Sequence, residues 1–247
     1  NYIYKILYRM CHTLIVIPTF NERENINPLL NSIFSLKISV DVLILDDNSP
    51  DGTKNVVIEN KKKYKDRLHL INREKKQGLG KAYIDGFKWA LNKKYKKIIQ
   101  MDADLSHPPE KLIKIVNELD MYDYVIGSRY INGIRVLNWP LNRIILSIGA
   151  SWYVKLITGL PVKDPTAGFV GYNRSSLLSL NLNKIMFVGY AFQIEMKFKL
   201  WKLGFNFKEI PITFKNRTRG ESKMNSSIIS EAIFGVIIVK FKSLFKK

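Results

Sequence analysis

Cysteine and histidine are scarce in this sequence, with one cysteine and three histidines among 247 residues. The single cysteine, Cys11, cannot form an internal disulfide, and the histidines are scattered without the spacing of zinc ligands. Long hydrophobic runs are also missing, because no stretch reaches the ~20 mostly apolar residues that span a bilayer. Residues 2–10 are too short and too interrupted for the apolar region of a signal peptide. These absences are typical of a protein that works in a reducing compartment.

Acidic residues are few compared with basic ones: 21 Asp and Glu against 40 Lys and Arg, which gives a net charge of +19. Such an excess favours an anionic partner, which could be nucleic acid, a phosphorylated substrate or a membrane surface. Charge alone does not choose among them. The sequence also lacks G-x-G-x-x-G after its first apolar run and has no G-x-x-x-x-G-K-[ST], so the dinucleotide and P-loop fingerprints are excluded.

Short apolar runs alternate with segments of helical periodicity through the first half of the chain. Strands are predicted at 13–18, 40–45, 68–72, 97–101 and 124–128, and helices at 25–36, 81–92 and 109–119. This alternation predicts an α/β fold with a mainly parallel sheet and helices on both faces. The polar clusters TFNE, DDNSPDG, DAD and GSRY follow four of the strands. They should therefore share the carboxyl edge of the sheet, where ligands bind in such folds.

The cluster DAD contains two carboxylates, Asp102 and Asp104, directly after an apolar run. Residues two apart in an extended chain point the same way, so these side chains should converge. Convergent carboxylates suit a hard divalent ion such as Mg²⁺ or Mn²⁺, whose open positions a diphosphate can fill. The alternative is a solvated turn before a helix that is capped near Ser106 and opened by Pro108 and Pro109.

Taken together, the motifs resemble a known family. The matching blocks are IPTFNERENI, DDNSPDGT, QGLGKAY, DADLSHPPE, GSRY, AGF, GYAFQIEM and EIPITFKNRTRGESKM, in order over residues 13–224. They are similar to the inverting family 2 glycosyltransferases of GT-A fold, and closely to the dolichol-phosphate or polyprenol-phosphate mannose synthases. The resemblance implies a Rossmann-like GT-A catalytic domain over residues 1–225.

The resemblance also implies roles for individual residues. The nucleotide-sugar pocket would be formed by Pro18, Phe20, Glu22, Asp46, Asp47, Asp102, Ala103, Asp104, Arg129, Arg217 and Lys223. Asp102 and Asp104 would hold the metal, with Ser106 a doubtful third ligand because many relatives carry the longer Gln there. Catalysis would fall to Asp104, Arg129 and Arg143, and the acceptor phosphate to Arg129, Arg143 and Ser147. Gln193 and Glu195 would face the sugar or the metal site, unless they only form a polar helix face.

Two later segments are expected at a membrane surface. Residues 139–160 are rich in apolar and aromatic side chains, which fits either a buried core helix or an interfacial amphipathic helix. Residues 226–247 predict a second helix that is apolar, lysine-rich at its end and too short to span a bilayer. It would bind anionic lipid or dock a small membrane-protein partner. We therefore expect a peripheral enzyme on the cytoplasmic face of a membrane.

The activity implied is transfer of mannose from GDP-mannose to a polyprenyl (dolichyl-type) phosphate with inversion, giving polyprenyl β-mannosyl phosphate and GDP. UDP-glucose or another nucleotide sugar is the alternative donor. A basic nucleic-acid-binding protein is the alternative of another class, and against it stand the absence of a recognised module and the clustered carboxylates, which would repel a phosphate backbone. A catalytically silent membrane scaffold is a third alternative.

Overall fold

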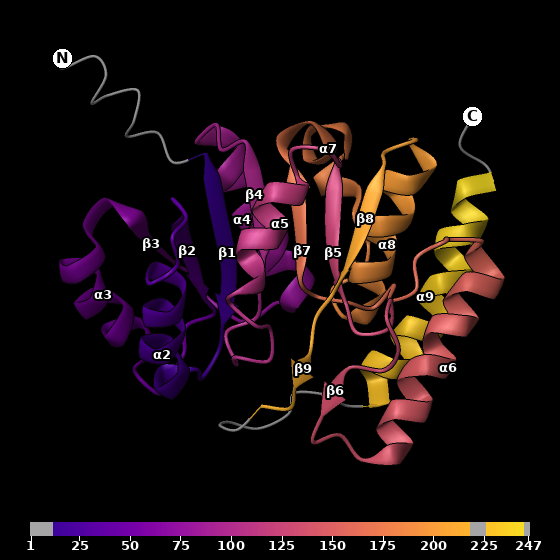
Figure 1. Ribbon diagram of the computed structural model, residues 1–247, viewed down its shortest axis with the longest axis horizontal. Coiled ribbons are helices and arrows are strands. Elements are labelled where there is room, and N and C mark those ends of the chain that lie inside the picture. The colour runs from indigo at the N-terminus through magenta and orange to yellow at the C-terminus, as the bar shows by residue number, and fades with distance from the viewer. Residues whose placement is uncertain (1–11, 218–225, 245–247) are drawn as a thin grey trace.

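A computed structural model describes residues 12–217 and 226–244. Its main sheet has seven strands in the order β3-β2-β1-β4-β7-β5-β8, and β6 and β9 form a separate two-stranded sheet (Figure 1). The strands are β1 (Thr13–Thr19), β2 (Asp41–Asp46), β3 (Leu68–Asn72), β4 (Lys97–Gln100), β5 (Tyr124–Ser128), β6 (Val136–Leu137), β7 (Val170–Asn173), β8 (Phe207–Pro211) and β9 (Phe214–Lys215). All pairs in the main sheet are parallel except those of β7, which runs antiparallel to β4 and β5. The prediction of a mainly parallel α/β sheet is confirmed.

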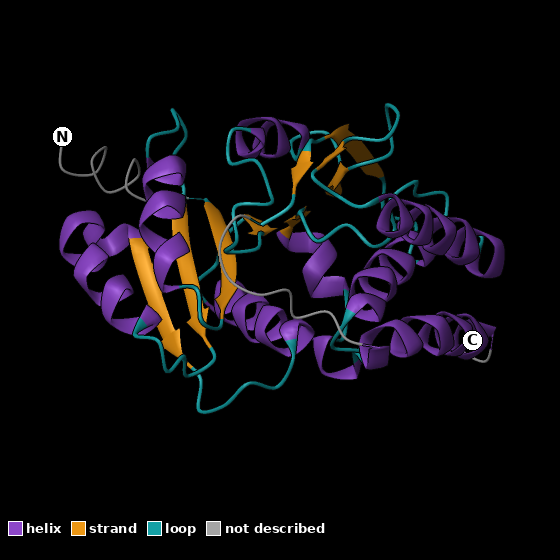
Figure 2. Ribbon diagram, turned by 90° about the horizontal axis from the view of Figure 1, so that it is seen from below, coloured by secondary structure: helices purple, strands orange, loops and turns teal. Residues whose placement is uncertain are grey.

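Helices cover both faces of the sheet, as the view in Figure 2 shows. They are α2 (Arg23–Phe34), α3 (Thr53–Tyr64), α4 (Leu79–Asn92), α5 (Lys111–Glu118), α6 (Leu141–Thr158), α7 (Arg174–Ser179), α8 (Tyr190–Lys202) and α9 (Ser226–Leu244), with short 3-10 turns at Lys65–Arg67 and Leu182–Lys184. The helices predicted at 25–36, 81–92 and 109–119 correspond to α2, α4 and α5.

The alternation of side chains along β1 explains why its apolar run is continuous. Leu14 and Val16 belong to one buried cluster, together with residues of α4 and α8. Ile15 and Ile17 point the other way and belong to a second cluster, with residues of α2 and α5. Each strand residue is therefore buried on one face or the other, as expected for a sheet covered on both sides.

The loops that follow three neighbouring strands contain backbone turns of unusual conformation. Asn21 after β1, Asn48 after β2 and Leu105 after β4 have φ values of 56°, 57° and 60°. Asparagine tolerates this left-handed region, whereas a leucine there costs about 1–2 kcal/mol. Such strain is kept where the surrounding structure needs the turn, and all three turns lie at the carboxyl edge of the sheet.

The chain after β5 adds a second set of elements at one end of the molecule (Figure 1). Pairing of β6 with β9 sets Val136 opposite Phe214, which brings the residues before α6 beside those after β8. Helix α9 lies against α6, where the Tyr153 hydroxyl donates to the Ile233 carbonyl at 3.0 Å. At Gly235 of α9, an added Cβ would come within 2.8 Å of Ala191 in α8. The tail helix is therefore packed onto the rest of the protein.

Candidate active site

Asp102 and Asp104 follow β4, and the protein holds their carboxylates by different contacts. The Tyr83 hydroxyl donates to Asp102 Oδ1 at 2.8 Å, and the Asp102 N–H donates to Nδ1 of His107 at 3.0 Å. Asp104 Oδ1 accepts the N–H of Ser106 at 3.1 Å, which the left-handed turn between them makes possible. Asp102 Oδ1 is thus held by a residue of α4 and Asp104 Oδ1 by the backbone of its own turn, and each carboxylate keeps further acceptor capacity.

The buried ring of His107 supports this turn and was not singled out from the sequence. It stacks on Phe169 with centroids 5.0 Å apart and meets Phe214 edge-on at 5.7 Å. Because Nδ1 accepts from Asp102, a neutral ring carries its proton on Nε2, which lies 3.9 Å from Asp102 Oδ2. A Cβ at Gly168 would come within 3.5 Å of the same Oδ2 and 3.4 Å of the ring. His107 could have been predicted from the sequence because it lies within the motif DADLSHPPE.

The oxygen donors around this turn are the carboxylates of Asp102 and Asp104 and the hydroxyl of Ser106. The Oγ of Ser106 is buried and has no hydrogen-bond partner among the described residues. Within residues 12–217 and 226–244 no group of three or more His, Cys, Asp or Glu side chains converges. Two carboxylates and one hydroxyl are hard oxygen donors, and they suit an ion that takes its remaining ligands from a diphosphate or from water.

Asp46 and Asp47 close β2 but have different environments. Asp46 is fully buried: its Oδ1 accepts from the hydroxyls of Thr19 at 2.9 Å and Ser49 at 2.6 Å, and its Oδ2 accepts from the Ser49 N–H at 2.9 Å. Both oxygens therefore hold the loop together. Asp47 instead forms a buried ion pair with Arg73. Burial raises the pKa of Asp47, and the guanidinium of Arg73 opposes that rise.

Arg73 follows β3 at the same sheet edge and links three segments. It pairs with Asp47, lies 3.1 Å from Asp85 Oδ2 on α4, and donates to Gln77 Oε1 at 3.5 Å. Sequence reasoning missed it, although its position directly after the third strand was the available signal. The Asp47 carboxylate at this edge is thus oriented by an arginine.

Residues expected near the nucleotide also lie along β1 and the start of α2. Glu22 is buried, accepts from Asn25 Nδ2 at 2.7 Å, and donates its N–H to Thr53 Oγ1 at 3.0 Å. The Lys76 ammonium lies 4.5 Å from the centre of the Phe20 ring. Pro18 is paired with Leu45 in the sheet, and Ala103 is buried between the two aspartates.

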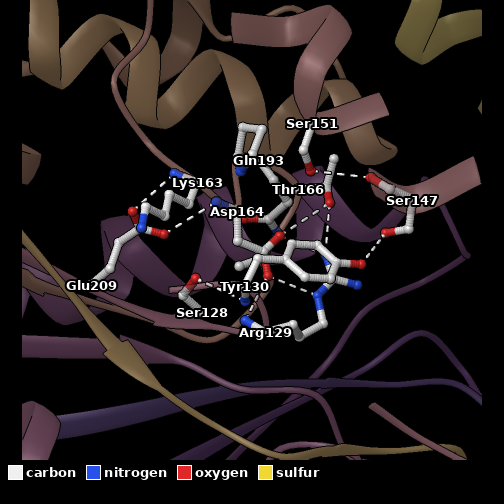
Figure 3. A network of polar contacts seen from close by, with 12 residues as sticks. Ser128, Arg129, Tyr130, Ser147, Ser151, Lys163, Asp164, Thr166, Gln193 and Glu209 are labelled. Atoms are coloured by element: carbon white, nitrogen blue, oxygen red, sulfur yellow. Dashed lines mark hydrogen bonds and ion pairs between the residues drawn. The ribbon is translucent and has the colours of Figure 1, made fainter. Parts of the chain in front are cut away.

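Arg129 at the end of β5 is held by a bidentate contact with Asp164 (Figure 3). Its Nε and Nη2 lie 2.7 and 2.6 Å from the two carboxylate oxygens, and Nη2 also donates to Thr166 Oγ1 at 2.8 Å. Burial disfavours the charge of Arg129, but Asp164 outweighs it and raises the pKa overall. Nη1 takes part in none of these bonds, so the fork is fixed in direction while one amino group is left for an anion.

Arg143 on α6 shares an aromatic ring with Arg129. The guanidinium carbon of Arg143 lies 3.9 Å from the centre of the Trp139 ring, and that of Arg129 lies 5.5 Å from it. Arg143 Nη1 also donates to Asn216 Oδ1 at 3.1 Å, across the β6–β9 pairing. Burial lowers the pKa of Arg143. Arg217, next along the chain from Asn216, pairs with Asp104 Oδ2 at 3.0 Å.

Ser147, one turn along α6 from Arg143, accepts from the Tyr130 hydroxyl at 2.7 Å (Figure 3). This bond ties α6 to the end of β5. The structure thus gathers Arg129, Arg143 and Ser147 around one region and connects it to the carboxylates through Arg217. Lys223 lies outside the described residues.

Gln193 and Glu195 of α8 are both buried but differ in their contacts. Gln193 Oε1 accepts from Gln100 Nε2 at 2.7 Å, and its own Nε2 has no partner among the described residues. Glu195 Oε2 accepts the N–H groups of Met186 at 2.9 Å and Phe187 at 3.2 Å, and its Oε1 lies 2.5 Å from the Lys199 ammonium. Glu195 thus fastens the segment before α8, whereas Gln193 keeps a free donor beside β4.

Solved structures with the same architecture define the fold. Glucosyl-3-phosphoglycerate synthase of Mycobacterium tuberculosis aligns with a TM-score of 0.69 at 17% identity, over 96% of this chain and 83% of that one. The same enzyme in complex with Mn²⁺, uridine diphosphate and phosphoglyceric acid aligns with a TM-score of 0.67 at 17% identity, over 95% of this chain and 79% of that one. The fold is the Rossmann-like GT-A fold of glycosyltransferases.

Sequence comparison gives the family. The profile of Glycosyl transferase family 2 matches residues 14–180. Polyprenol monophosphomannose synthase of Mycolicibacterium smegmatis is 41% identical over 91% of this chain and 85% of its own length. Undecaprenyl-phosphate mannosyltransferase of Micrococcus luteus is 40% identical over 90% and 91%, respectively. The chain belongs to glycosyl transferase family 2 and, within it, to the polyprenyl-phosphate mannosyltransferases, which confirms the resemblance carried by the motifs.

Proposed function

We propose that this protein transfers mannose from GDP-mannose to a polyprenyl phosphate with inversion, giving polyprenyl β-mannosyl phosphate and GDP. The observation that carries the proposal is the 41% identity, over 91% of this chain, with a polyprenol monophosphomannose synthase. The chemistry of the site supports it, because Arg217 pairs with Asp104 and the nearby Arg143 and Arg129 share the Trp139 ring, so that cations gather where an anionic donor must meet an anionic acceptor.

The donor would lie along the ends of β1, β2 and β4. Asp47, oriented by Arg73, would read the base or the ribose, and Arg217 would contact the diphosphate. Asp102 and Asp104, with Ser106 Oγ, would hold Mg²⁺ or Mn²⁺, an ion that neutralises charge developing on the departing diphosphate. The remaining members of this pocket are Pro18, Phe20, Glu22 and Ala103.

The acceptor phosphate would be held by Arg129 and Arg143, with Ser147 beside them. A lipid monophosphate has a second pKa of ~6 by analogy with phosphoserine, so it is anionic near pH 7 and is its own nucleophile. One of its oxygens attacks the anomeric carbon, a carbon–oxygen bond forms, and the bond to the diphosphate oxygen breaks, so that GDP leaves with the electron pair. The arginines supply placement and charge stabilisation, and no side-chain base is required.

The lipid tail of such an acceptor calls for contact with a membrane, and α6 and α9 offer an apolar surface. Both helices carry large apolar side chains that are exposed: Leu141, Ile145, Leu146, Trp152 and Leu156 on α6, and Ile233, Phe234, Ile237, Ile238 and Phe241 on α9. Across the described residues, no helix combines the length and the apolar character needed to cross a membrane. We place this surface on the cytoplasmic leaflet, where a small membrane protein could also dock.

The proposal is tested by incubating the purified protein with labelled GDP-mannose, Mn²⁺ and vesicles that contain a polyprenyl phosphate. We expect label in the lipid fraction, released by mild acid as mannose, and none when the lipid lacks its phosphate. UDP-glucose is offered in a parallel reaction at the same concentration. Transfer from UDP-glucose with none from GDP-mannose would replace the donor in this proposal, and transfer from neither would refute it.

A further inference from the structure

Lys197 on α8 is a fully buried lysine that the reaction above does not use. Its side chain turns back toward the start of the helix and donates to three backbone carbonyls: Pro165 at 3.1 Å, Ala167 at 2.7 Å and Gln193 at 3.2 Å. A buried amino group is costly unless its N–H donors are satisfied, and here Nζ has a carbonyl acceptor in three directions. Two of the three acceptors belong to a turn between α6 and β7, residues 164–168.

That turn has no strand or helix to satisfy its own buried carbonyls, so side chains must do so. The Asp164 carbonyl accepts from the Ala167 N–H within the turn, and the Gly168 carbonyl accepts from Gln100 Nε2 at 2.7 Å. The carbonyls of Pro165 and Ala167 accept from Lys197. An apolar residue at position 197 would leave these two without the donor that now fixes the turn.

The same turn orients the guanidinium of Arg129. Asp164 supplies both oxygens of the bidentate contact and Thr166 supplies a third acceptor (Figure 3). On its other side the turn is held by Glu209 of β8, which accepts the N–H groups of Lys163 at 2.8 Å and Asp164 at 3.1 Å. Lys197 and Glu209 therefore clamp the turn from opposite elements.

We infer that Lys197 is a positioning residue for the proposed mannosyl transfer, because its amino group donates to the Pro165 and Ala167 carbonyls and so fixes the 164–168 turn that aims Arg129 at the acceptor phosphate. The inference rests on the proposed function and adds a role for a buried lysine of α8. Loss of Lys197 should affect the acceptor side of the site, since, among the described residues, the turn bonds to Arg129 and has no bond to Asp47 or Arg73 on the nucleotide side. Loss of Lys197 should weaken the use of lipid phosphate more than the use of GDP-mannose.

The test is steady-state kinetics of Lys197→Met, with each substrate varied in turn and unfolding followed in parallel. We expect KM for lipid phosphate to rise about tenfold, the size of one misplaced charge-assisted hydrogen bond, with KM for GDP-mannose within about twofold. Lys197→Gln introduces an amide with two N–H donors, so its KM for lipid phosphate should lie between those of the parent and of Lys197→Met. If Lys197→Met does not fold, Lys197→Gln is the variant on which the two KM values are compared.

Lys199→Met is the matched control, because Lys199 also joins α8 to a loop carbonyl, that of Lys184 at 3.0 Å, but does not touch the 164–168 turn. It should lower stability while leaving the ratio of the two KM values as in the parent. Equal rises of both KM values in Lys197→Met and Lys197→Gln, or a loss of stability without any change in KM, would overturn the inference. Failure of the proposed function would show instead as a parent protein that is inactive with both substrates.

Discussion

At the scale of single residues, Asp104 differs from its neighbour Asp102 because its two oxygens already serve a backbone N–H and Arg217. Asp104→Asn keeps an oxygen for the N–H of Ser106, so the turn and the fold should survive. The amide lacks the charge that a divalent ion requires, and we expect metal-dependent GDP-mannose binding to fall by at least about 100-fold. Titration calorimetry with and without Mn²⁺ measures this. If Asp104→Asn binds GDP-mannose as tightly as the parent, or if turnover by the parent persists in chelator, Asp104 is not a metal ligand.

Arg143 lies over Trp139 and bonds to Asn216, which suits a planar guanidinium better than an ammonium. Arg143→Lys preserves charge but loses the fork, so KM for lipid phosphate should rise several-fold more than KM for GDP-mannose. Arg135→Lys, at an exposed position, is the control and should leave both values unchanged. A defect confined to GDP-mannose would move Arg143 to the donor side.

Lys197 also predicts a pH dependence of stability. Burial lowers its pKa to about 7, against the opposing charge of Asp164, with Arg129 and Glu209 as the other charged groups that act on it. An unfolded lysine has a pKa of ~10.4, so from pH ~7 to ~10 the unfolded state binds a proton that the native state lacks, and stability rises with pH by about 1.4 kcal/mol per unit.

Lys197→Met has no such proton. The free energy of unfolding of the parent minus that of the variant should therefore increase from pH 7 to pH 10, measured by urea unfolding at each pH. A difference that stays constant over this range would mean that the native lysine remains charged.

Sequence reasoning at this scale predicted polar residues that do follow strand ends, but it did not predict the contacts that burial decides. Asp46 and Asp47 are adjacent and chemically identical, yet only Asp47 pairs with Arg73. Both oxygens of Asp46 instead accept hydrogen bonds from Thr19 and from Ser49 of the loop. Asp164 was missed for a related reason: its role depends on a contact with Arg129, which lies 35 residues away along the chain. Residue type and spacing do not encode such a pairing.

At the scale of elements, helices α6 and α9 contain glycines in opposite environments. Gly235 of α9 faces Ala191 and the Phe187 ring, and an added Cβ would lie 2.8 and 3.1 Å from them. Gly149 of α6 is exposed, and a Cβ there would meet nothing within 4 Å. The first glycine permits close helix packing, whereas the second only weakens its helix.

We therefore expect Gly149→Ala to stabilise the protein by up to about 1 kcal/mol and Gly235→Ala to destabilise the docking of α9. Thermal unfolding reports the first effect, and hydrogen exchange of α9 amides reports the second. Stabilisation by both substitutions would show that α9 does not pack closely on α8.

Sequence periodicity located the elements up to β5 well. The predicted strands at 68–72 and 124–128 match β3 and β5 in their bounds, and the helix predicted from residue 81 begins at Leu79. The strands after β5 were not predicted: β6 and β9 have only two residues each, but β7 is as long as the predicted β4 and β8 is as long as β3. The antiparallel insertion of β7 between β4 and β5 depends on pairing between distant segments, which no local pattern reveals.

At the scale of the whole molecule, the net charge of +19 and the apolar surface of α6 and α9 would act together in the proposed binding to a membrane. Basic residues draw a protein to anionic lipid at ~1 kcal/mol each near the surface, and buried apolar side chains then hold it there. Binding to vesicles should therefore need anionic lipid, weaken with salt, and depend on exposed side chains such as Leu156 and Phe241.

The double substitution Leu156→Glu and Phe241→Glu tests this with an internal control. These side chains are 83% and 59% exposed, so the variant should fold, and it should sediment with anionic vesicles at least about tenfold less than the parent. Met121→Glu, at a position 80% exposed outside both helices, adds one of the same charges and should have little effect. GDP-mannose binding should be unchanged in both proteins, because neither helix position contacts the carboxylates. Vesicle binding by the double variant at the parent level would mean that another surface of this cationic protein meets the membrane.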